Sequence, residues 1–357
     1  MQLLFCLLLA TNLLVASAAD LGTQKRPSPQ VELGKKLFFD RRLSANGTLS
    51  CAMCHIPEQG FAQNQLATPV GFKGRSVKRN SPTLLNVAQR KILFFDGREF
   101  SLENQVWSPL LSPREMGNVS IGSVINRLQR LDDYPALFSR AYQEPITAHN
   151  IGAALTAYEQ TLRATDSPFD RWYFGGQISA VDDDVVKGFG LFLRSGCQNC
   201  HSFETGHHQF TDDDFHNTGI GFARAMQAPM RGTRTVRLAQ TITIEVTESF
   251  EADNLNDLGR YEMTGIAADK WKYRTPTLRN IALTAPYMHD GSLSSLKEVI
   301  AFYISGGIEN QGLDARIKPL QLSDSESSQL IAFLNSLTSS HIRALIEDAR
   351  HTTIGDY

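Results

Sequence analysis

The chain has 357 residues, a formal net charge of -2, and average contents of apolar (42%) and charged (20%) residues. A chain of this length can bury at least one large core, and two domains are the better expectation. The nearly balanced charge argues against nucleic acid as a partner.

The first 18 residues fit a secretory signal peptide, because the apolar run Leu3–Ala10 is followed by the small-residue cleavage pattern Ala16-Ser17-Ala18. A buried first helix is disfavoured by Asp20 and by the polar, proline-containing stretch that follows it. No later run is long enough to span a membrane. We therefore expect an exported protein whose mature chain, from residue 19, does not cross a membrane.

Four of the five cysteines fall in two identical patterns, Cys51-Ala-Met-Cys54-His55 and Cys197-Gln-Asn-Cys200-His201. This is the attachment pattern of c-type haem, in which two thiols form thioethers with the haem and the adjacent histidine is held below the iron. A zinc site or a redox disulfide also uses paired cysteines, but neither needs a histidine directly after the second cysteine in both copies. The sequence predicts two covalently bound haem c groups, with His55 and His201 as iron ligands.

The two halves of the chain repeat one another around these patterns. Residues 82–97 match residues 276–291 without a gap, and Gly-x-x-Leu-Phe precedes each cysteine pair, at 34–38 and at 188–192. We expect a boundary near Gly175-Gly176, with an N-terminal domain at 19–175 and a C-terminal domain at 176–357.

Helical periodicity dominates both halves. Ile151, Leu155 and Tyr158 share one helical face, and Ser323-Asp-Ser-Glu326 is a capping box ahead of another apolar helix. The exception is Thr241–Val246, whose alternation predicts a strand in a short hairpin. The predicted fold class is mainly α, with few short strands.

Several motifs together resemble those of the bacterial di-haem cytochrome c peroxidase and MauG family. They are the two cysteine patterns, Phe215-His-Asn-Thr-Gly219, Leu258-Gly-Arg-Tyr-Glu262, and the block that runs from Arg274-Thr-Pro-Thr-Leu-Arg-Asn280 to His289-Asp-Gly291. The resemblance covers nearly the whole mature chain. It implies a periplasmic enzyme with two tandem cytochrome-c-like helical domains, in which hydrogen peroxide reacts at the N-terminal haem and the second haem stores or relays electrons.

Residues 103–117 resemble the wall that faces the open side of the reactive haem. By that match Glu115 is the acid and base that moves the proton during O–O cleavage, and Gln105 and Pro109 line the same pocket. Relatives often block this iron with a second histidine, whereas here no histidine occurs between His55 and His149. We expect an open iron position. The alternative is a blocking methionine or a lysine, Lys73 or Lys78.

Tyr303 decides which branch of the family the sequence resembles. It falls where typical peroxidases carry a methionine ligand to the second haem and MauG-type enzymes carry a tyrosine, and it shares a helical face with Leu296 and Ile300. The alternatives are a packed core tyrosine and ligation by Met263 or Met288. A phenolate ligand favours higher oxidation states of iron. The sequence therefore resembles the tyrosine-ligated, MauG-like branch most closely.

Two further cofactor-binding assignments rest on the resemblance alone. Phe95 stands where the family usually has a tryptophan between the haems, which puts rapid charge sharing in doubt unless Trp107, Trp271 or direct tunnelling compensates. His216 matches a residue near the haem propionates. His207 and His208 match nothing in the family and are expected to be exposed.

The resemblance also implies a calcium ion between the haems. By that match its ligands are the Asn80 side chain and the backbone carbonyls of Thr284 and Pro286. Such hard oxygen ligands suit calcium, and waters must complete the shell.

The predicted function is a MauG-like use of hydrogen peroxide to oxidise Trp or Tyr side chains of a partner protein, through a high-valent state shared by the two haems. The alternative is a cytochrome c peroxidase that takes electrons from a small cytochrome or a cupredoxin. A non-enzymatic di-haem electron carrier is disfavoured, because a carrier is better served by two closed irons and has no use for Glu115.

Overall fold

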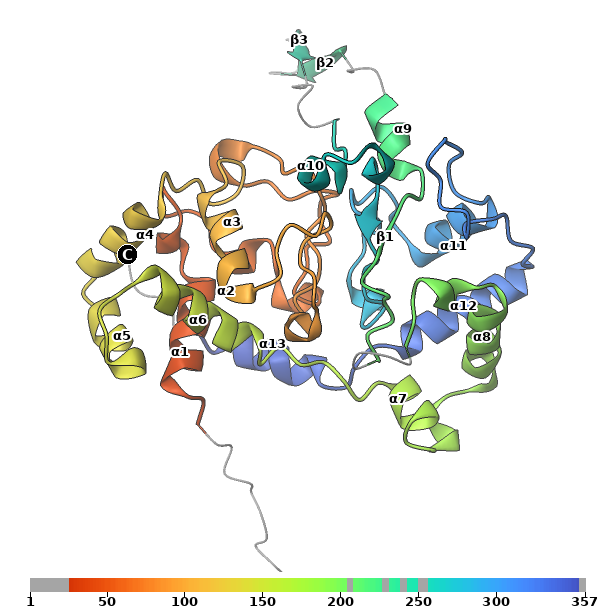
Figure 1. Ribbon diagram of the computed structural model, residues 1–357, viewed down its shortest axis with the longest axis horizontal. Helices are drawn as coiled ribbons and strands as arrows, with labels where there is room; N and C mark the ends of the chain where they lie inside the picture. Colours follow the sequence, from red (N-terminus) through yellow and green to blue (C-terminus); the bar gives the residue numbers. More distant parts are fainter. Residues whose placement is uncertain (1–25, 204–207, 227–230, 238–242, 250–255, 353–357) are drawn as a thin grey trace, which may run out of the picture.

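A computed structural model describes residues 26–203, 208–226, 231–237, 243–249 and 256–352 of the protein. The expected signal peptide and His207 lie outside these residues. Helices make up most of the regular structure, so the prediction of a mainly α fold with few short strands is confirmed (Figure 1). Among the described helices none has both the length and the apolar character to cross a membrane.

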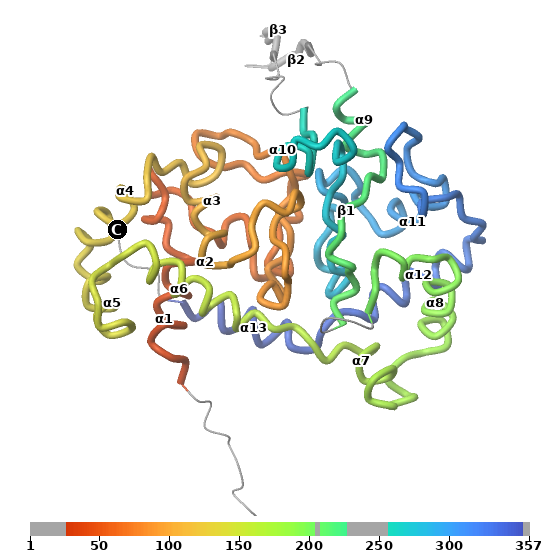
Figure 2. The backbone as a smooth tube through the Cα atoms, viewed as in Figure 1, coloured from red at the N-terminus to blue at the C-terminus, as the bar shows by residue number. Residues whose placement is uncertain are grey.

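The N-terminal half packs its helices around one hydrophobic cluster. Its helices are α1 (Pro29–Phe39), α2 (Leu102–Gln105), α3 (Trp107–Leu111), α4 (Ile121–Arg130), α5 (Tyr134–Tyr142) and α6 (Ala148–Glu159). The helix near the C-terminus, α13 (Ile342–Arg350), returns to this half and adds Ala349 to the cluster, with Ile342 and Leu345 packed against it (Figure 2). The proposed division near residue 175 stays a prediction.

The C-terminal half has a second cluster that is rich in phenylalanine, including Phe169, Phe189, Phe192 and Phe333. Its helices are α7 (Pro168–Tyr173), α8 (Asp183–Arg194), α9 (Ile220–Met226), α10 (Tyr261–Thr264), α11 (Leu296–Ile304) and α12 (Asp324–Ser336). Helix α12 begins at the predicted capping box, where the Ser323 and Glu326 side chains each accept from the other's backbone N–H.

Two small antiparallel sheets complete the described structure. Strand β1 (Phe215–His216) pairs with β4 (Tyr273–Arg274), and β2 (Arg231–Arg237) pairs with β3 (Thr243–Ser249). The second sheet is the hairpin expected near Thr241–Val246, although residues 241 and 242 lie outside the described part.

The sequence repeat corresponds to a repeated helix crossing. Helix α1 packs on α6, and α8 packs on α12. A Cβ atom at Gly34 would lie 1.8 Å from the carbonyl oxygen of Ala154, and one at Gly188 would lie 2.0 Å from that of Gln329. Glycine in the Gly-x-x-Leu-Phe motif is therefore required by backbone contact between the helices.

The aligned segments 82–97 and 276–291 also make matching turns. The Thr83 hydroxyl donates to the Gly60 carbonyl and the Thr277 hydroxyl to the Gln209 carbonyl, both at 2.5 Å. Three residues further along each segment, Asn86 and Asn280 are both left-handed. Because each turn lies next to one cysteine pattern, both halves present their histidines in the same way.

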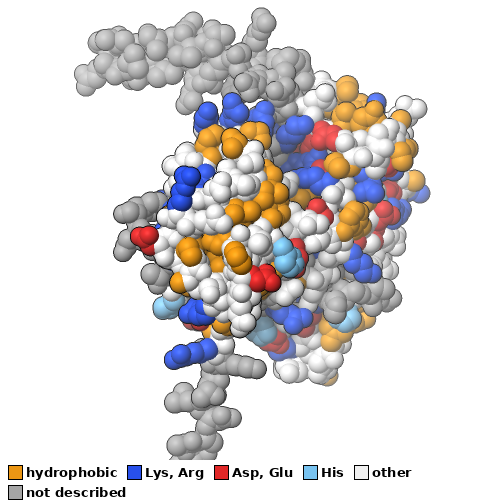
Figure 3. All heavy atoms as spheres, turned by 60° about the vertical axis from the view of Figure 1, so that its left-hand side comes forward, with side chains coloured by type: hydrophobic (Ala, Val, Ile, Leu, Met, Phe, Trp, Pro, Cys, Tyr) orange, Lys and Arg blue, Asp and Glu red, His pale blue; other side chains and the backbone are white. Residues whose placement is uncertain are grey.

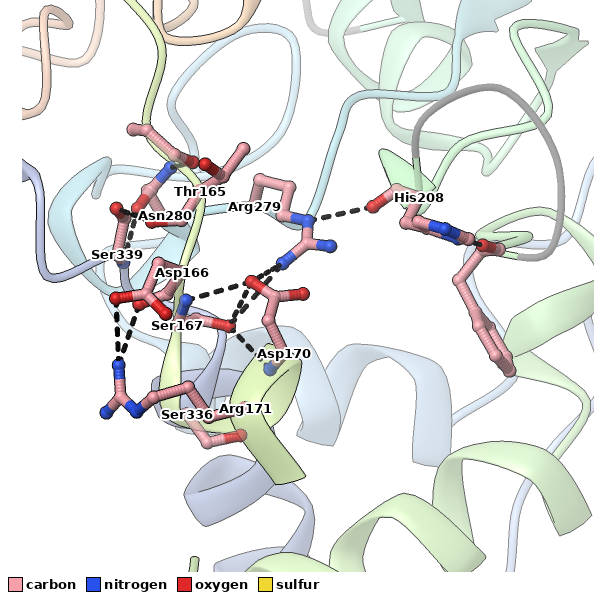
Figure 4. Close-up of polar contacts among 12 residues, drawn as sticks. Thr165, Asp166, Ser167, Asp170, Arg171, His208, Arg279, Asn280, Ser336 and Ser339 are labelled. Atoms are coloured by element: carbon pink, nitrogen blue, oxygen red, sulfur yellow. Dashed lines mark hydrogen bonds and ion pairs between the residues drawn. The ribbon is translucent and has the colours of Figure 1, made fainter. Parts of the chain in front are cut away.

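The chain passes between the halves beside a polar cluster (Figure 4). Arg279 Nη1 donates to Asp170 Oδ2 at 2.7 Å, and the Asn280 side chain accepts from the Ser339 backbone N–H at 2.8 Å. The expectation that His208 is exposed is wrong. Its ring packs against Phe174 at a tilt of 32°, with 4.1 Å between the ring centroids, and its carbonyl accepts from Arg279.

Buried ion pairs join the two halves directly. Arg79 binds Asp96 of its own half at 2.5 Å and Asp257 of the other half at 2.6 Å. Arg260 stacks on Phe215 and donates to the Asp96 carbonyl at 3.3 Å. The relative position of the halves is therefore set by charged groups at their contact.

Candidate functional site

A cavity of about 360 Å³ lies in the N-terminal half and reaches the contact with the other half. It is lined by all the residues predicted for the reactive haem, namely Cys51, Cys54, His55, Gln105, Pro109 and Glu115, and also by Phe95 and Asn80. The structure thus brings together residues that are up to 64 positions apart in the sequence, from Cys51 to Glu115.

His55 is oriented by its backbone surroundings. Residues Cys51–Met53 form a 3-10 turn, and His55 Nδ1 lies 3.1 Å from the Phe61 carbonyl. A carbonyl only accepts hydrogen bonds, so Nδ1 carries the proton and Nε2 keeps the lone pair that binds a metal. Burial lowers the pKa of His55 to about 4, which keeps the ring neutral.

The second pattern repeats this geometry. Residues Cys197–Asn199 form the same turn, and His201 Nδ1 lies 3.0 Å from the Phe210 carbonyl. Burial lowers the pKa of His201 as well. In both halves the structure places a neutral imidazole next to two cysteines.

The four described cysteines are free thiols. Burial raises the pKa of Cys51 to about 12 and the pKa values of Cys54 and Cys197 to about 11. Such thiols are poor redox nucleophiles. A pair of unjoined thiols beside a buried neutral histidine is the donor set that a c-type haem requires, so the residues fit this cofactor at both patterns.

Glu115 lies in the cavity wall and is held from two sides. Its carbonyl accepts from the Phe72 N–H at 2.8 Å, and Gly71 packs so closely that a Cβ would lie 2.1 Å from the Arg114 carbonyl oxygen. Burial raises the pKa of Glu115, and a hydrogen bond from Ser112 and the charge of Arg98 oppose this effect. Glu115 is thus a buried carboxyl group in the wall of the cavity.

The two lysines considered as blocking ligands are placed differently. Lys73 is exposed and lies outside the cavity lining. Lys78 lines the cavity, but its Nζ pairs with Glu262 at 3.2 Å. Met116 also lines the cavity beside Glu115 and is buried.

Phe95 is buried at the contact between the halves. It lines the cavity, and its carbonyl accepts from the Arg274 N–H at 2.7 Å. Trp107 packs against the first hydrophobic cluster, and Trp271 packs edge-on against Phe222 with 5.1 Å between the ring centroids. Neither tryptophan belongs to the cavity lining.

Tyr303 lies on α11 beside the second cysteine pattern. Burial and the nearby thiols of Cys200 and Cys197 raise the pKa of its phenol. Of the two methionines considered as rival ligands, Met263 is 50% exposed on α10, whereas Met288 is half-buried. Ligation by Tyr303 stays a prediction, and the structure places its side chain near Cys197 and Cys200.

His216 lies beside the same pattern. Its Nε2 is 2.9 Å from Asp212 Oδ2 and its Nδ1 is 2.8 Å from Asp314 Oδ2. Burial opposes the charged ring, but the hydrogen bonds outweigh it and raise the pKa of His216 to about 10. The side chain is close to Cys200 and carries a positive charge at neutral pH.

The residues expected to bind calcium lie near the contact between the halves. Asn80 is buried, its Nδ2 donates to the Ala67 carbonyl at 2.9 Å, and its backbone N–H donates to the His289 carbonyl at 2.7 Å. The Thr284 side chain packs near Gly60. Asn80 Oδ1 is left as the side-chain oxygen that can face a cation.

Several charged residues of the cavity were not anticipated from the sequence. They are Arg79, Arg90, Asp96, Arg98, Glu159, Glu262 and Arg274. Glu159 is the one with a readable signal, because it follows Ile151 and Leu155 at helical spacing on the buried face of α6. Its Oε2 is buried and has no hydrogen-bond partner.

Comparison with known proteins gives a consistent picture. Residues 28–178 match the family described as di-haem cytochrome c peroxidase. The chain is 37% identical over 313 residues to the methylamine utilization protein MauG of Methylorubrum extorquens, covering 86% of this chain and 78% of that protein. It is 32% identical over 327 residues to the cytochrome c551 peroxidase of Pseudomonas aeruginosa, covering 91% and 83%. A solved MauG-like protein associated with microbial copper homeostasis matches with a TM-score of 0.70 and 28% identity, covering 92% of this chain and 97% of that one.

Replacing Glu159→Gln should stabilise the protein increasingly as the pH rises. Burial raises the pKa of Glu159 from 4.5 to about 8, so the folded chain keeps a proton that the unfolded chain releases, and wild type loses stability across this range. Urea unfolding of the variant and of wild type gives the difference between their free energies of unfolding at pH 5 and at pH 8. This difference should be larger at pH 8 by at least about 1 kcal/mol. A difference that is equal at both pH values would contradict this account.

Proposed function

The chain belongs to the di-haem cytochrome c peroxidase and MauG family, and we propose that it uses hydrogen peroxide to oxidise Trp or Tyr side chains of a partner protein. Membership implies two haem c cofactors and makes the protein a haem-dependent oxidoreductase of the peroxidase class. We choose oxidation of a partner protein over simple peroxide reduction because Tyr303 lies beside the second cysteine pattern.

The haems would be held by the two cysteine patterns. Cys51 and Cys54 would attach one haem above His55, and Cys197 and Cys200 the other above His201. The matching backbone hydrogen bonds of the two histidines support this assignment, because both fix the same tautomer. When bound, the haems supply the iron at which peroxide is reduced and the electrons that this reduction consumes.

Glu115 would move the proton at the N-terminal haem. Its carboxyl shares the cavity with the two cysteines and His55, and burial raises its pKa. Gln105 and Pro109 form the wall beside it and would orient peroxide and limit water access. Arg98, whose charge acts on Glu115, would stabilise the carboxylate when the proton has left.

Tyr303 would ligate the second haem. A phenolate places negative charge on the metal and so favours oxidised iron over reduced iron. The second haem would then be a poor acceptor from an ordinary cytochrome and a good store of oxidising power. A cytochrome c peroxidase that draws electrons from a small cytochrome or a cupredoxin is the second candidate, supported by the likeness to the cytochrome c551 peroxidase.

The partner would meet the protein in the periplasm, after removal of the signal peptide at 1–18. The N-terminal half offers exposed apolar side chains for such a contact, among them Phe100 (69% exposed) and Val119 (91%). On the face turned forward in Figure 3, hydrophobic side chains gather in several places, and Lys and Arg side chains line the upper edge.

A calcium ion would lie between the haems, bound by Asn80 and by the carbonyls of Thr284 and Pro286. The fixed orientation of the Asn80 amide supports this, since its donor is already used by Ala67.

Glu115→Gln should slow the reaction with peroxide by about 10²- to 10⁴-fold, because glutamine cannot accept the proton. Stopped-flow absorption of the haem bands measures this rate. The matched control is Glu103→Gln, which changes a carboxyl of the same segment outside the cavity lining and should react like wild type. Equal rates for the two variants would remove Glu115 from the proposed role.

Electron paramagnetic resonance of the ferric protein, before and after stoichiometric peroxide, tests the function itself. Wild type should show one high-spin and one low-spin signal, and both should vanish with peroxide. Tyr303→Phe should lose this response, and Tyr173→Phe, at a residue 44% exposed, should keep it. Two low-spin signals that ignore peroxide until the protein is half reduced, and that ignore the Tyr303 change, would point to the conventional peroxidase instead.

Removing calcium by chelation should alter the spectra of both haems, because the proposed ligands come from both halves of the chain. The measurement compares absorption and resonance spectra before chelation, after it, and after calcium is restored. Spectra that stay the same in calcium-free protein would rule the site out.

A further inference from the structure

Two arginines from different halves of the chain lie in the wall of the same cavity. Arg90 comes from the N-terminal half and Arg274 from strand β4 of the C-terminal half. Arg274 is 3% exposed, and the Nε atom of Arg90 is buried without a hydrogen-bond partner. Burial and the nearby charge of Arg274 lower the pKa of Arg90 to about 9.

The protein neutralises these two charges only in part. Arg274 Nη1 pairs with Asp213 Oδ1 at 3.2 Å, and its Nε donates to the Phe94 carbonyl at 3.1 Å. Arg90 Nη2 donates to backbone carbonyls alone, those of Thr83 at 3.2 Å and Leu85 at 3.5 Å. Among the described contacts, Asp213 is the one carboxylate in an ion pair with either arginine, and the charge of Asp212 also acts on Arg274.

None of the other acidic groups of the cavity is among the described partners of Arg90 and Arg274. Asp96 binds Arg79 and Arg98, and Glu262 binds Lys78. Glu115 is acted on by Arg98, and Glu159 lies near Cys51. Buried unpaired charge is costly, so the arrangement favours an anion that enters with the ligand of the cavity.

We propose that Arg90 and Arg274 bind the carboxylate groups of the haem attached at Cys51 and Cys54. This inference rests on haem attachment in the proposed function, not on the oxidation of a partner protein. A guanidinium group is suited to it because its planar fork pairs with a carboxylate through two hydrogen bonds. One half of the chain thus attaches the haem, and the other half supplies one of its two cations.

Arg274 also connects this site to the second cysteine pattern. Its partner Asp213 follows Asp212, whose backbone N–H donates to the Cys200 carbonyl at 2.8 Å. Arg90 makes no described hydrogen bond to Asp213, and only the charge of this carboxylate acts on it. The two arginines are therefore expected to differ in their effect on the second haem.

Spectroelectrochemical titration of both haems, without peroxide or partner protein, tests the proposal. Loss of a nearby cation favours the ferric state of a haem. Arg90→Gln should therefore lower the equilibrium constant for reduction of the N-terminal haem about tenfold, which corresponds to a decrease of 59 mV in its reduction potential for one electron. The reduction potential of the second haem should not change. Arg274→Gln should lower the potential of the N-terminal haem similarly and also shift that of the second haem. Arg90→Lys and Arg274→Lys should recover most of the shift, and Arg130→Gln, at an exposed arginine of α4, should have no effect.

Asp213→Asn provides a test that keeps both cations. Because it removes a nearby negative charge, it should raise the equilibrium constant for reduction of the N-terminal haem. Haem content measured on every variant separates the premise from the proposal, because the thioethers should retain both haems. Absence of haem from the wild-type protein would overturn the premise, and Gln variants whose N-terminal haem titrates like that of Arg130→Gln would overturn the proposal. Failure to oxidise a partner protein, with the shifts as expected, would overturn the proposed function alone.

Discussion

The backbone contact between two crossing helices in each half is the constraint on which the rest of the structure depends. Because α1 meets α6 at Gly34, Phe38 from one helix and Leu155 and Glu159 from the other reach the same cavity wall. The turn that carries Cys51 packs on α1 as well. The helix crossing, the cysteine pattern and the cavity therefore form one unit, and the contact at Gly188 has the same place in the second half.

Features that depend on short stretches of sequence could be predicted, and those that depend on contact between distant segments could not. The cysteine patterns, the repeated turns and the capping box at Ser323 are local, so the sequence indicated them directly. Arg90 and Arg274 lie in the wall of one cavity only because the two halves meet there. In the aligned repeat Arg90 corresponds to Thr284, so the repeat did not indicate this arrangement. His208 was misjudged for the same reason, because Phe174, which covers it, comes from an earlier segment.

Charged groups connect the two halves of the chain beside the cavity. Arg79 is 12% exposed and holds carboxylates from both sides. Buried pairs of this kind contribute little net stability compared with well-packed apolar groups, but they are costly to break one partner at a time. They are also less sensitive to salt than surface pairs. Asp96 joins this network directly after Phe95, so Phe95 is held at the contact between the halves by the same network.

The position of α13 has a consequence for the order in which the chain acquires its structure. Ile342, Leu345 and Ala349 pack into the core of the N-terminal half, although they belong to α13, which follows every other described helix in the chain. That core is therefore complete only when nearly the whole chain has been made, while the second core needs nothing beyond Leu337. The half that comes first in the sequence is the last to be finished.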